Sequence, residues 1–463
     1  MTEYEKFLEG KKIAAISSGF ELPKERMNPM LFDWQKDVVY WALKKGRAAL
    51  FEECGLGKSG QSIQWAEAVS EHSGKPVLIV CPLAVADQFR REALKFGFRE
   101  ITVCRNQRHV KSGVNVTNYE MLEHFDISEF GGVVLDESSI LKSYTGKMKR
   151  MIVDTFKAAP YRLACSATPA PNDLMELLNQ AEFLGVMKSS EALSCWFITD
   201  FESGHYRLKG HAEKDFWRWV SSWAVCIDKP SDIGYSDEGY ILPPMGEITV
   251  TVKPEEDDPF AAIREGMSMN ATSYHAEKRK TIMQRAEETA KIVASSNEQF
   301  VVWCYQNDEA DVLKRLIPEA VEIRGSDKPE TKEKAAIDFV NGKTRVLISK
   351  PSIFGMGLNF QQCSKMVFCG MDYSFESYYQ AVRRVWRFGQ DKPVTVWRVI
   401  GTNETVILDT VERKARQKKD MSIGMAQAVK EFQTGEIHGK QFKLNMERQT
   451  TDFPSWLRSE KSA

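Results

Sequence analysis

Short runs of β-branched and other apolar residues recur along the chain, and most are followed by a Gly- or Ser-bearing turn and an amphipathic stretch. These runs predict β-strands at residues 48–51, 77–81, 114–117, 133–135 and 162–165, and again at 300–304, 321–323, 345–348, 365–369 and 394–399. Nearly continuous apolar strands that alternate with helices are typical of parallel sheets covered on both faces. The pattern therefore predicts an α/β protein with two doubly wound lobes.

A different stretch lies between the two groups of strands. It holds four tryptophans, at 196, 217, 219 and 223, and then the turn-rich segment KPSDIGYSDEGYILPP. We place the first lobe at residues 1–240, with a helical insert at about 190–240, and the second lobe at 241–425. The tryptophans are more typical of a packed core than of a platform on which DNA bases stack.

The end of the chain carries a basic, helix-forming pattern. After Thr410 the segment VERKARQKKDMSIGMAQAVKEF predicts a pair of helices with a basic start. Residues 426–463 are expected to form a helical tail.

Composition excludes several classes of protein. The 463 residues include 63 Lys and Arg against 64 Asp and Glu, so a histone-like basic binder is excluded. The longest apolar run, residues 77–86, contains a proline and is shorter than the roughly 20 residues that a membrane span requires. Nine dispersed cysteines and an acidic first segment predict reduced thiols and a cytoplasmic protein, without membrane partners.

The sharpest chemical signal is the segment EECGLGKS, which follows a predicted strand and precedes a predicted helix. Gly55 and Gly57 let backbone N–H groups close around phosphate oxygens, and the helix N-terminus favours an anion. Lys58 is expected to reach the β- and γ-phosphates and Ser59 to ligate Mg²⁺. Glu52 stands where the usual phosphate-loop motif has its first glycine.

A second signal is the strand GVVLD, which ends in Asp136 and is followed by Glu137. The carboxyl ends of parallel strands are where ligands bind in α/β sheets. We expect Asp136 to hold hydrated Mg²⁺, and Glu137 to orient and deprotonate an attacking water.

A third signal is the segment QAVRRVWRFGQ, with Ser374 as a predicted helix N-cap and Gly389 as its end. Gln380, Arg384 and Arg387 stand at positions i, i+4 and i+7, which predicts that they share one helix face. The guanidinium fork matches phosphate oxygens and keeps its charge, so the arginines are candidate arginine fingers from the second lobe.

In this order, the motifs resemble those of superfamily-two helicase-like ATPases, and among them the Swi/Snf-like DNA translocases. The segments that carry the resemblance are LFDWQKDVVYWA, ECGLGKSGQ, VLIVCPLAVADQF, VTNYEML, SATPAPNDL, ISKPSIFGMGLNF and QAVRRVWRFGQ. The resemblance implies two RecA-like lobes with the nucleotide in the cleft between them. It implies ATP and Mg²⁺ as cofactors, with Gln35 contacting adenine and Gly357 contributing to the nucleotide site.

The resemblance also implies a nucleic-acid track, expected to be duplex DNA gripped along one strand without base readout. The residues that it assigns to nucleic-acid contact are Thr117, Tyr119, Lys142, Ser166 and Thr168. Further candidates for a basic groove are Arg90, Arg91, Lys147, Lys149 and Arg150.

The chain departs from the family pattern in three places. Ser138 and Ser139 follow the acidic pair where the family has Ala-His or Gly-His, and Arg383 replaces a usually acidic residue. The segment between the lobes is short, which is similar to the minimal helicases of phages and bacterial mobile elements and disfavours chromatin remodelling. The corresponding expectation is activity in the cytosol of a bacterial host.

Two other functions remain open from the sequence. One is a helicase that separates the strands of DNA or RNA. The other is an ATP-gated DNA clamp or loader that acts with a partner protein, which would also supply targeting. A small-molecule kinase is disfavoured by the arginine segment and the second lobe.

Overall fold

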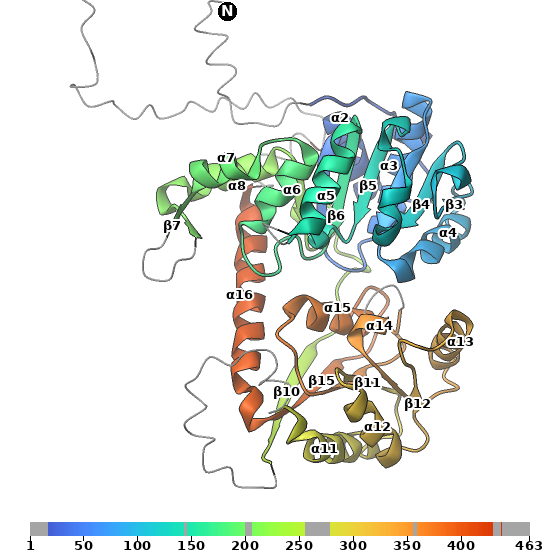
Figure 1. Cartoon of the computed structure of the whole chain (residues 1–463), viewed down its shortest axis with the longest axis vertical. Helices are drawn as coiled ribbons and strands as arrows, with labels where there is room; N and C mark the ends of the chain where they lie inside the picture. Colours follow the sequence, from blue (N-terminus) through green and yellow to red (C-terminus); the bar gives the residue numbers. More distant parts are fainter. Residues whose placement is uncertain are drawn as a thin grey trace, which may run out of the picture.

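The computed structural model describes residues 17–142, 146–199, 206–254, 278–354 and 359–428, together with residue 437. Figure 1 shows two α/β lobes, one above the other, with the long helix α16 (Thr405–Ala428) running beside both. Each lobe is a parallel sheet between layers of helices, so the predicted two-lobe architecture is confirmed. The first sheet ends at Ile227 and the second begins at Met245, on either side of the predicted boundary.

Within the described residues, the sheet of the first lobe has seven parallel strands in the order β3-β4-β2-β5-β6-β1-β9. The strands are β1 (Arg47–Glu52), β2 (Val77–Cys81), β3 (Thr102–Val103), β4 (Val114–Asn118), β5 (Gly132–Asp136), β6 (Tyr161–Ser166) and β9 (Ala224–Ile227). Five of them coincide with the predicted apolar runs. The sequence pattern did not predict the short β3, or β9, which pairs with β1 at the other edge of the sheet.

The sheet of the second lobe has six parallel strands in the order β10-β15-β14-β11-β13-β12, again counted over the described residues. The strands are β10 (Met245–Val252), β11 (Phe300–Cys304), β12 (Val321–Glu322), β13 (Val346–Ser349), β14 (Lys365–Cys369) and β15 (Val394–Gly401). Five lie where apolar runs predicted them. The sixth, β10, was missed because it is a largely exposed edge strand that alternates polar and apolar residues.

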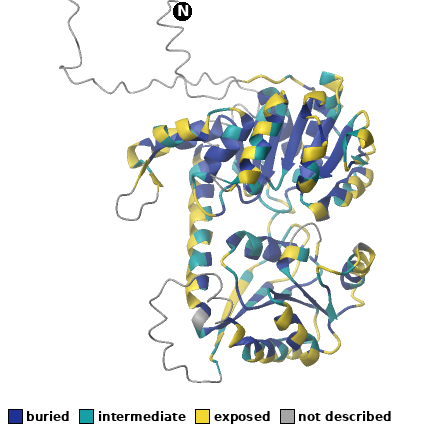
Figure 2. Ribbon diagram, in the orientation of Figure 1, coloured by how far each residue is buried: buried dark blue, intermediate teal, exposed yellow. Residues whose placement is uncertain are grey.

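Helices cover both faces of each sheet, and Figure 2 shows buried strands inside each lobe with exposed residues on the outer faces of the helices. The helices of the first lobe are α2 (Asp33–Lys45), α3 (Lys58–Ser73), α4 (Ala86–Lys95), α5 (Lys147–Thr155), α6 (Glu176–Leu184), α7 (Ser189–Trp196) and α8 (Glu213–Ser221). Those of the second lobe are α11 (Ile282–Ala294), α12 (Asn307–Leu316), α13 (Pro329–Val340), α14 (Pro351–Phe354) and α15 (Phe375–Val385).

Strand β1 shows how the sheet separates two cores. Ala48 and Leu50 pack in the cluster that contains α2, α3 and α4, whereas Ala49 and Phe51 pack in the cluster that contains α6 and α8. Successive side chains of a strand point to opposite faces, so an unbroken apolar run serves both cores. The phosphate-loop segment follows directly from this buried strand.

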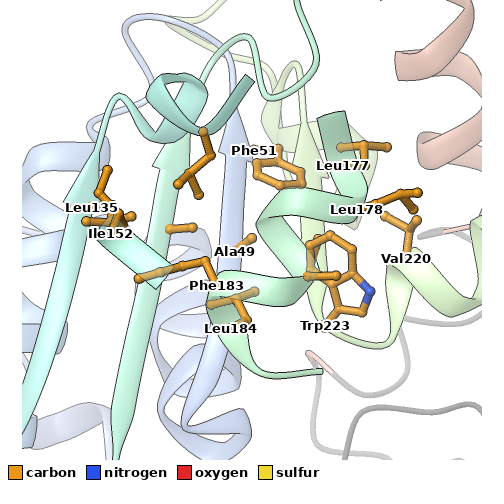
Figure 3. Close-up of a cluster of buried hydrophobic side chains, with 14 of the residues drawn as sticks. Ala49, Phe51, Leu135, Ile152, Leu177, Leu178, Phe183, Leu184, Val220 and Trp223 are labelled. Atoms are coloured by element: carbon orange, nitrogen blue, oxygen red, sulfur yellow. The ribbon is translucent and has the colours of Figure 1, made fainter. Parts of the chain in front are cut away.

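The tryptophans of the predicted insert belong to the second of these cores. Trp196, Trp217, Trp219 and Trp223 are all buried, and the ring centroids of Trp219 and Trp223 lie 5.6 Å apart. Figure 3 shows Trp223 and Val220 beside Leu177 and Leu178 of α6 and Phe51 of β1. These tryptophans therefore pack the first lobe, as the sequence favoured, and do not form an exposed stacking platform.

Replacing Trp219 with alanine is expected to lower the free energy of unfolding of the first lobe by about 3–5 kcal/mol, because it opens a cavity in a close-packed core. Chemical denaturation followed by circular dichroism measures this change. Ile198→Ala, at a residue of the insert that is 42% exposed, is the matched control and should have little effect. Unchanged stability in Trp219→Ala would contradict the core role.

Helix α16 corrects the prediction of a helical pair after Thr410. The segment forms one helix, with Ile407 and Val411 buried in the second lobe and Met421 buried in the first. Gly424 does not interrupt the helix. A Cβ at this position would lie 2.8 Å from the Trp217 ring, so glycine allows α16 to pack closely against that ring. The predicted tail at 426–463 lies outside the described residues beyond Ala428, apart from residue 437.

Two further properties follow from the described structure. None of its helices is both long enough and apolar enough to cross a membrane. All nine cysteines are free thiols, and seven of them are buried.

Candidate nucleotide site

The phosphate-loop segment connects β1 to α3, as its position between a predicted strand and a predicted helix indicated. Gly55 and Gly57 have φ angles of 93° and 83°, a region of conformational space that favours glycine. Lys58 opens α3, and its Nζ donates to the carbonyl oxygens of Glu52 at 2.8 Å and Glu53 at 3.2 Å. The lysine therefore lies folded across the loop, with its ammonium beside the turn that would hold the phosphates.

Gln35 of α2 lies directly against this loop. Its Nε2 donates to the carbonyl oxygen of Leu56 at 2.7 Å, and its Oε1 accepts from the backbone N–H of Phe32 at 3.0 Å. A Cβ at Gly57 would lie 2.5 Å from the Gln35 amide, so the loop needs glycine there on steric grounds as well. The structure thus places the predicted adenine-contacting residue beside the phosphate loop.

The sequence reasoning missed an aromatic pair that lies beside Trp34, the residue before Gln35. The ring centroids of Tyr240 and Phe388 lie 5.0 Å apart, and Tyr240 also contacts Trp34 at 5.9 Å. Phe388 belongs to the segment QAVRRVWRFGQ, and a Cβ at Gly55 would lie 3.2 Å from its backbone nitrogen. The second lobe therefore packs directly on the phosphate loop. The signal in the sequence was the aromatic residue after the last arginine of that segment.

Asp136 and Glu137 lie at the carboxyl end of β5. Glu137 has a φ of 53°, the only positive φ of a non-glycine residue among the described residues, and one of its carboxylate oxygens is buried without a hydrogen-bond partner. Burial raises the pKa of Asp136 to about 8, with a further contribution from the charge of Glu137. A buried carboxylate pair with an unpaired oxygen is a fitting environment for a divalent cation. The donor set therefore fits Mg²⁺.

The electrostatics of Glu137 connect the two lobes. Burial raises its pKa, and the positive charges of Lys58 from the first lobe and Arg384 from the second counteract this rise. Burial lowers the pKa of Arg384, and the charges of Glu137 and Asp136 oppose that decrease. The charges of a lysine from the first lobe and an arginine from the second therefore act on the same carboxylate.

The arginine segment is only partly a helix. Ser374 caps α15, as predicted, and its side chain accepts from the backbone N–H of Ser377 at 3.2 Å. The helix ends at Val385, so the prediction that Arg387 shares a helix face with Gln380 and Arg384 is wrong.

The physical reason for the early end of α15 lies in Trp386. Its indole N–H donates to the carbonyl oxygen of Pro243 at 2.8 Å, and its own carbonyl accepts from Arg383 at 3.1 Å. Both bonds hold Trp386 outside the helical conformation. Arg387 follows in a turn, where it donates to the side chain of Asn359.

Three further residues of the predicted nucleotide site lie in different surroundings. Gln380 is buried in α15, and its carbonyl oxygen accepts from the Nε of Arg384 at 3.3 Å. Gly357 lies outside the described residues. Ser59 follows Lys58 in the first turn of α3 and is half-buried.

The residues assigned to nucleic-acid contact are mostly inside the protein in this conformation. Thr117, Tyr119, Ser166 and Thr168 are all less than 5% exposed, and the Tyr119 hydroxyl donates to the backbone oxygen of Asp136 at 2.6 Å. Lys142 keeps 45% of its side chain exposed. Of the five residues, only Lys142 therefore offers a surface that a nucleic-acid backbone could reach without a change of conformation.

Glu376 of α15 accepts hydrogen bonds from three donors of the first lobe. The hydroxyl of Ser139 donates to its carboxylate, as do Lys142 Nζ at 2.8 Å and the Thr168 hydroxyl at 3.4 Å. The serine that departs from the family pattern after the acidic pair is thus part of a contact between the lobes. Sequence reasoning missed Glu376 because it carries no local motif.

The remaining groove candidates divide between the surface and the interior. Lys149 is buried and pairs with Glu182, so its assignment to a nucleic-acid groove is wrong. Arg91 pairs with Glu333 of the second lobe, and Arg90 pairs with Asp87 at 3.2 Å. The exposed candidates on α5 are Lys147 and Arg150.

Comparison with protein families gives two matches that together follow the two lobes. A model described as the SNF2-related domain matches residues 34–216, and one described as the helicase conserved C-terminal domain matches residues 276–389. The chain belongs to the Swi/Snf-like family of superfamily-two helicase-related ATPases. Membership makes it a nucleic-acid-dependent ATPase.

Among curated proteins, the chain is 26% identical to the human DNA annealing helicase and endonuclease ZRANB3 over 447 residues, which cover 85% of the chain and 40% of that protein. It is 30% identical over 168 residues to a Caenorhabditis elegans SWI/SNF-related matrix-associated actin-dependent regulator of chromatin subfamily A-like protein 1 homolog, covering 33% of the chain and 24% of the relative. The chain thus spans well under half the length of either relative.

Among solved structures, the Sulfolobus solfataricus SWI2/SNF2 ATPase core in complex with dsDNA is 18% identical to the chain. The match covers 90% of the chain and 98% of that structure, with a TM-score of 0.43.

Proposed function

We propose that this Swi/Snf-like ATPase hydrolyses ATP in the cleft between its lobes and uses the cycle to move along duplex DNA. The observation that carries the proposal is that the second lobe packs on the phosphate loop, with Phe388 against Gly55, and that the charges of Lys58 and Arg384, from different lobes, both lower the pKa of Glu137. A residue set that is complete only when two lobes meet is suited to coupling hydrolysis with lobe movement.

Each residue has a distinct part in the proposed chemistry. Gln35 contacts the adenine, and the backbone of the phosphate loop with Lys58 binds the phosphates. Glu137 orients the attacking water and accepts its proton. Arg384 and Arg387 stabilise the charge that develops on the transferred phosphoryl group.

Mg²⁺ would be held by Ser59 and Asp136. When bound, it supplies the positive charge that neutralises the β- and γ-phosphates.

The proposal that the track is DNA rests on the names of the relatives and on the exposed basic side chains of the first lobe. The relatives' printed names include a DNA annealing helicase, and the exposed basic residues Lys142, Lys147 and Arg150 lie on and before α5. Contacts to phosphates fix position on a duplex without reading sequence, so a few basic side chains are sufficient for a track. Closure on ATP and opening after hydrolysis would alternate the grip of the two lobes.

The deciding experiment measures ATP hydrolysis with single-stranded DNA, duplex DNA and RNA side by side, and with duplexes of increasing length. We expect the greatest stimulation by duplex DNA and a rate that rises with duplex length. Lys58→Ala is the control, because loss of the phosphate-binding ammonium should abolish hydrolysis under every condition.

Other results would favour the rival functions. Hydrolysis that responds to DNA but not to its length would favour an ATP-gated clamp that acts with a partner protein. Displacement of one strand of a duplex in an unwinding assay, without displacement of a triplex-forming strand, would favour a strand-separating helicase. Stimulation by RNA alone would overturn the assignment of DNA as the track.

A further inference from the structure

The phosphate loop carries a second acidic residue, Glu53, which the proposed chemistry does not use. Its carboxylate accepts from four donors: Cys54 N at 2.7 Å, Arg383 Nη2 at 2.8 Å, Lys418 Nζ at 3.0 Å, and the hydroxyl of Tyr379. Burial would raise the pKa of Glu53, but the charges of Lys418 and Arg383 outweigh burial and hold this pKa well below its usual range. Glu53 is therefore an ionised carboxylate whose charge is neutralised by the second lobe and α16.

The position of Glu53 gives its charge a direct bearing on nucleotide binding. Its carboxylate accepts from the backbone N–H of Cys54 in the phosphate loop, and the carbonyl oxygen of the same residue accepts from Lys58 Nζ at 3.2 Å, so the charge lies on the loop that would hold the phosphates. An uncompensated negative charge there would repel the triphosphate, and the repulsion between charges is strong where water is excluded. Pairing of this carboxylate would remove that repulsion.

Lys418 reaches Glu53 from a helix 365 positions later in the sequence. Its side chain is 14% exposed, its Nζ also donates to the Tyr379 hydroxyl at 2.6 Å, and it lies over the Tyr379 ring at 3.8 Å. The ammonium is therefore held in place by the second lobe as well as by the phosphate loop.

Helix α16 has its own anchors on the first lobe near Lys418. Met421 and Met425 are buried in the core beside α8, and the Ser422 hydroxyl donates to Asp228 Oδ1 at 3.1 Å. Gly424 packs against the Trp217 ring. These contacts fix the turn of α16 that presents Lys418 to the phosphate loop.

We propose that Lys418 is a positioning residue of the nucleotide site, which neutralises Glu53 so that docking of α16 on the first lobe sets the affinity of the phosphate loop for ATP. The inference rests on the proposed function, because it assigns ATP to this loop. It extends the site to a helix that carries none of the recognised motifs.

The first test compares Lys418→Met with Lys418→Arg and with the matched control Lys419→Met, whose native side chain is exposed. We expect Lys418→Met to raise the KM for ATP and the Kd for Mg²⁺–ATP about tenfold, a size typical of coupled neighbouring groups. We expect little effect on kcat at saturating ATP. Lys418→Arg and Lys419→Met should remain close to the parent protein, and circular dichroism checks that all are folded.

The second test removes the charge that Lys418 neutralises. In the double variant Glu53→Gln with Lys418→Met, the KM for ATP should return to that of Glu53→Gln alone. A loss of affinity that came from misplaced α16 packing would remain in the double variant. Arg383→Gln is measured alongside, alone and combined with Glu53→Gln. It removes the cation that the second lobe contributes to Glu53, so the series tests the same charge compensation even if Lys418→Met does not fold.

An unchanged Kd in Lys418→Met, or no recovery on adding Glu53→Gln to either cationic variant, would overturn the proposal. Equilibrium binding of Mg²⁺–ATP is measured without nucleic acid. Absence of DNA-stimulated hydrolysis in the parent protein would therefore defeat the proposed function while the binding series still tests Lys418.

Discussion

Glu137→Gln is expected to lower the rate of ATP hydrolysis by about 100-fold to 10,000-fold, the range for loss of a general base. Glutamine keeps the shape of the side chain but cannot accept the proton of the attacking water. Because Ser59 and Asp136, and not Glu137, are the residues assigned to hold Mg²⁺, Mg²⁺–ATP should still bind. Steady-state hydrolysis with duplex DNA, together with equilibrium nucleotide binding, measures the two effects separately.

The matched control for this prediction is Glu123→Gln, at an exposed position in the same lobe. It should hydrolyse ATP at the rate of the parent protein. A Glu137→Gln variant that retains DNA-stimulated hydrolysis would show that another group activates the water. The assignment of the acidic pair would then need to be abandoned.

Arg384→Ala is expected to reduce kcat by about 1,000-fold to 100,000-fold, the range for an arginine finger. The guanidinium stabilises charge that develops in the transition state, so its loss should spare nucleotide binding. Arg384 is buried and its charge interacts with that of Glu137, whereas Arg387 is bonded to Asn359 in a turn. We expect Arg387→Ala to reduce kcat as well, through a group that must turn from Asn359 toward the phosphates.

Single-turnover kinetics with saturating ATP distinguish this effect from a loss of affinity. Arg315→Ala, at an exposed arginine on α12 of the same lobe, is the control and should leave kcat unchanged. Loss of nucleotide binding in Arg384→Ala with normal kcat at saturation would contradict a finger role. It would instead make Arg384 a ground-state contact.

Much of the candidate nucleotide site could be located from the sequence because its parts follow local patterns. A buried strand, a glycine turn and a helix place Lys58 at the start of α3, and a buried strand places Asp136 at the sheet edge. Both strands are parallel members of one sheet, so their carboxyl ends lie on the same side. The amino-acid order alone was sufficient to bring these residues together.

Other parts of the site were not predictable because they depend on contacts between distant residues. Lys418 and Glu376 carry ordinary helical surface charges in the sequence, and no periodicity marks them as inter-lobe residues. Lys149 has the same appearance, but its pairing with Glu182 places it inside the first lobe. A charge becomes solvated or buried according to what packs on it, and that information is not local.

The end of α15 shows the same limitation at a helix terminus. Gly389 is a reasonable stop signal, but the helix ends earlier because Trp386 bonds to Pro243, a residue of the connection between the lobes. Likewise, α16 continues through Gly424 because the Trp217 ring packs against the helix at the place where a side chain would otherwise lie. In both cases a tertiary contact overrides a local preference.

The amino-acid sequence by itself determined the two α/β lobes, the positions of their principal strands along the chain and the chemical groups of the candidate nucleotide site, because short-range patterns of apolar and glycine residues encode them. Only the tertiary structure decided that α16 spans both lobes, that Glu53 is neutralised by Lys418, and that Glu376 binds Ser139. These pairings join residues more than 200 positions apart. Their energies depend on burial and geometry that exist only once the two lobes have packed together.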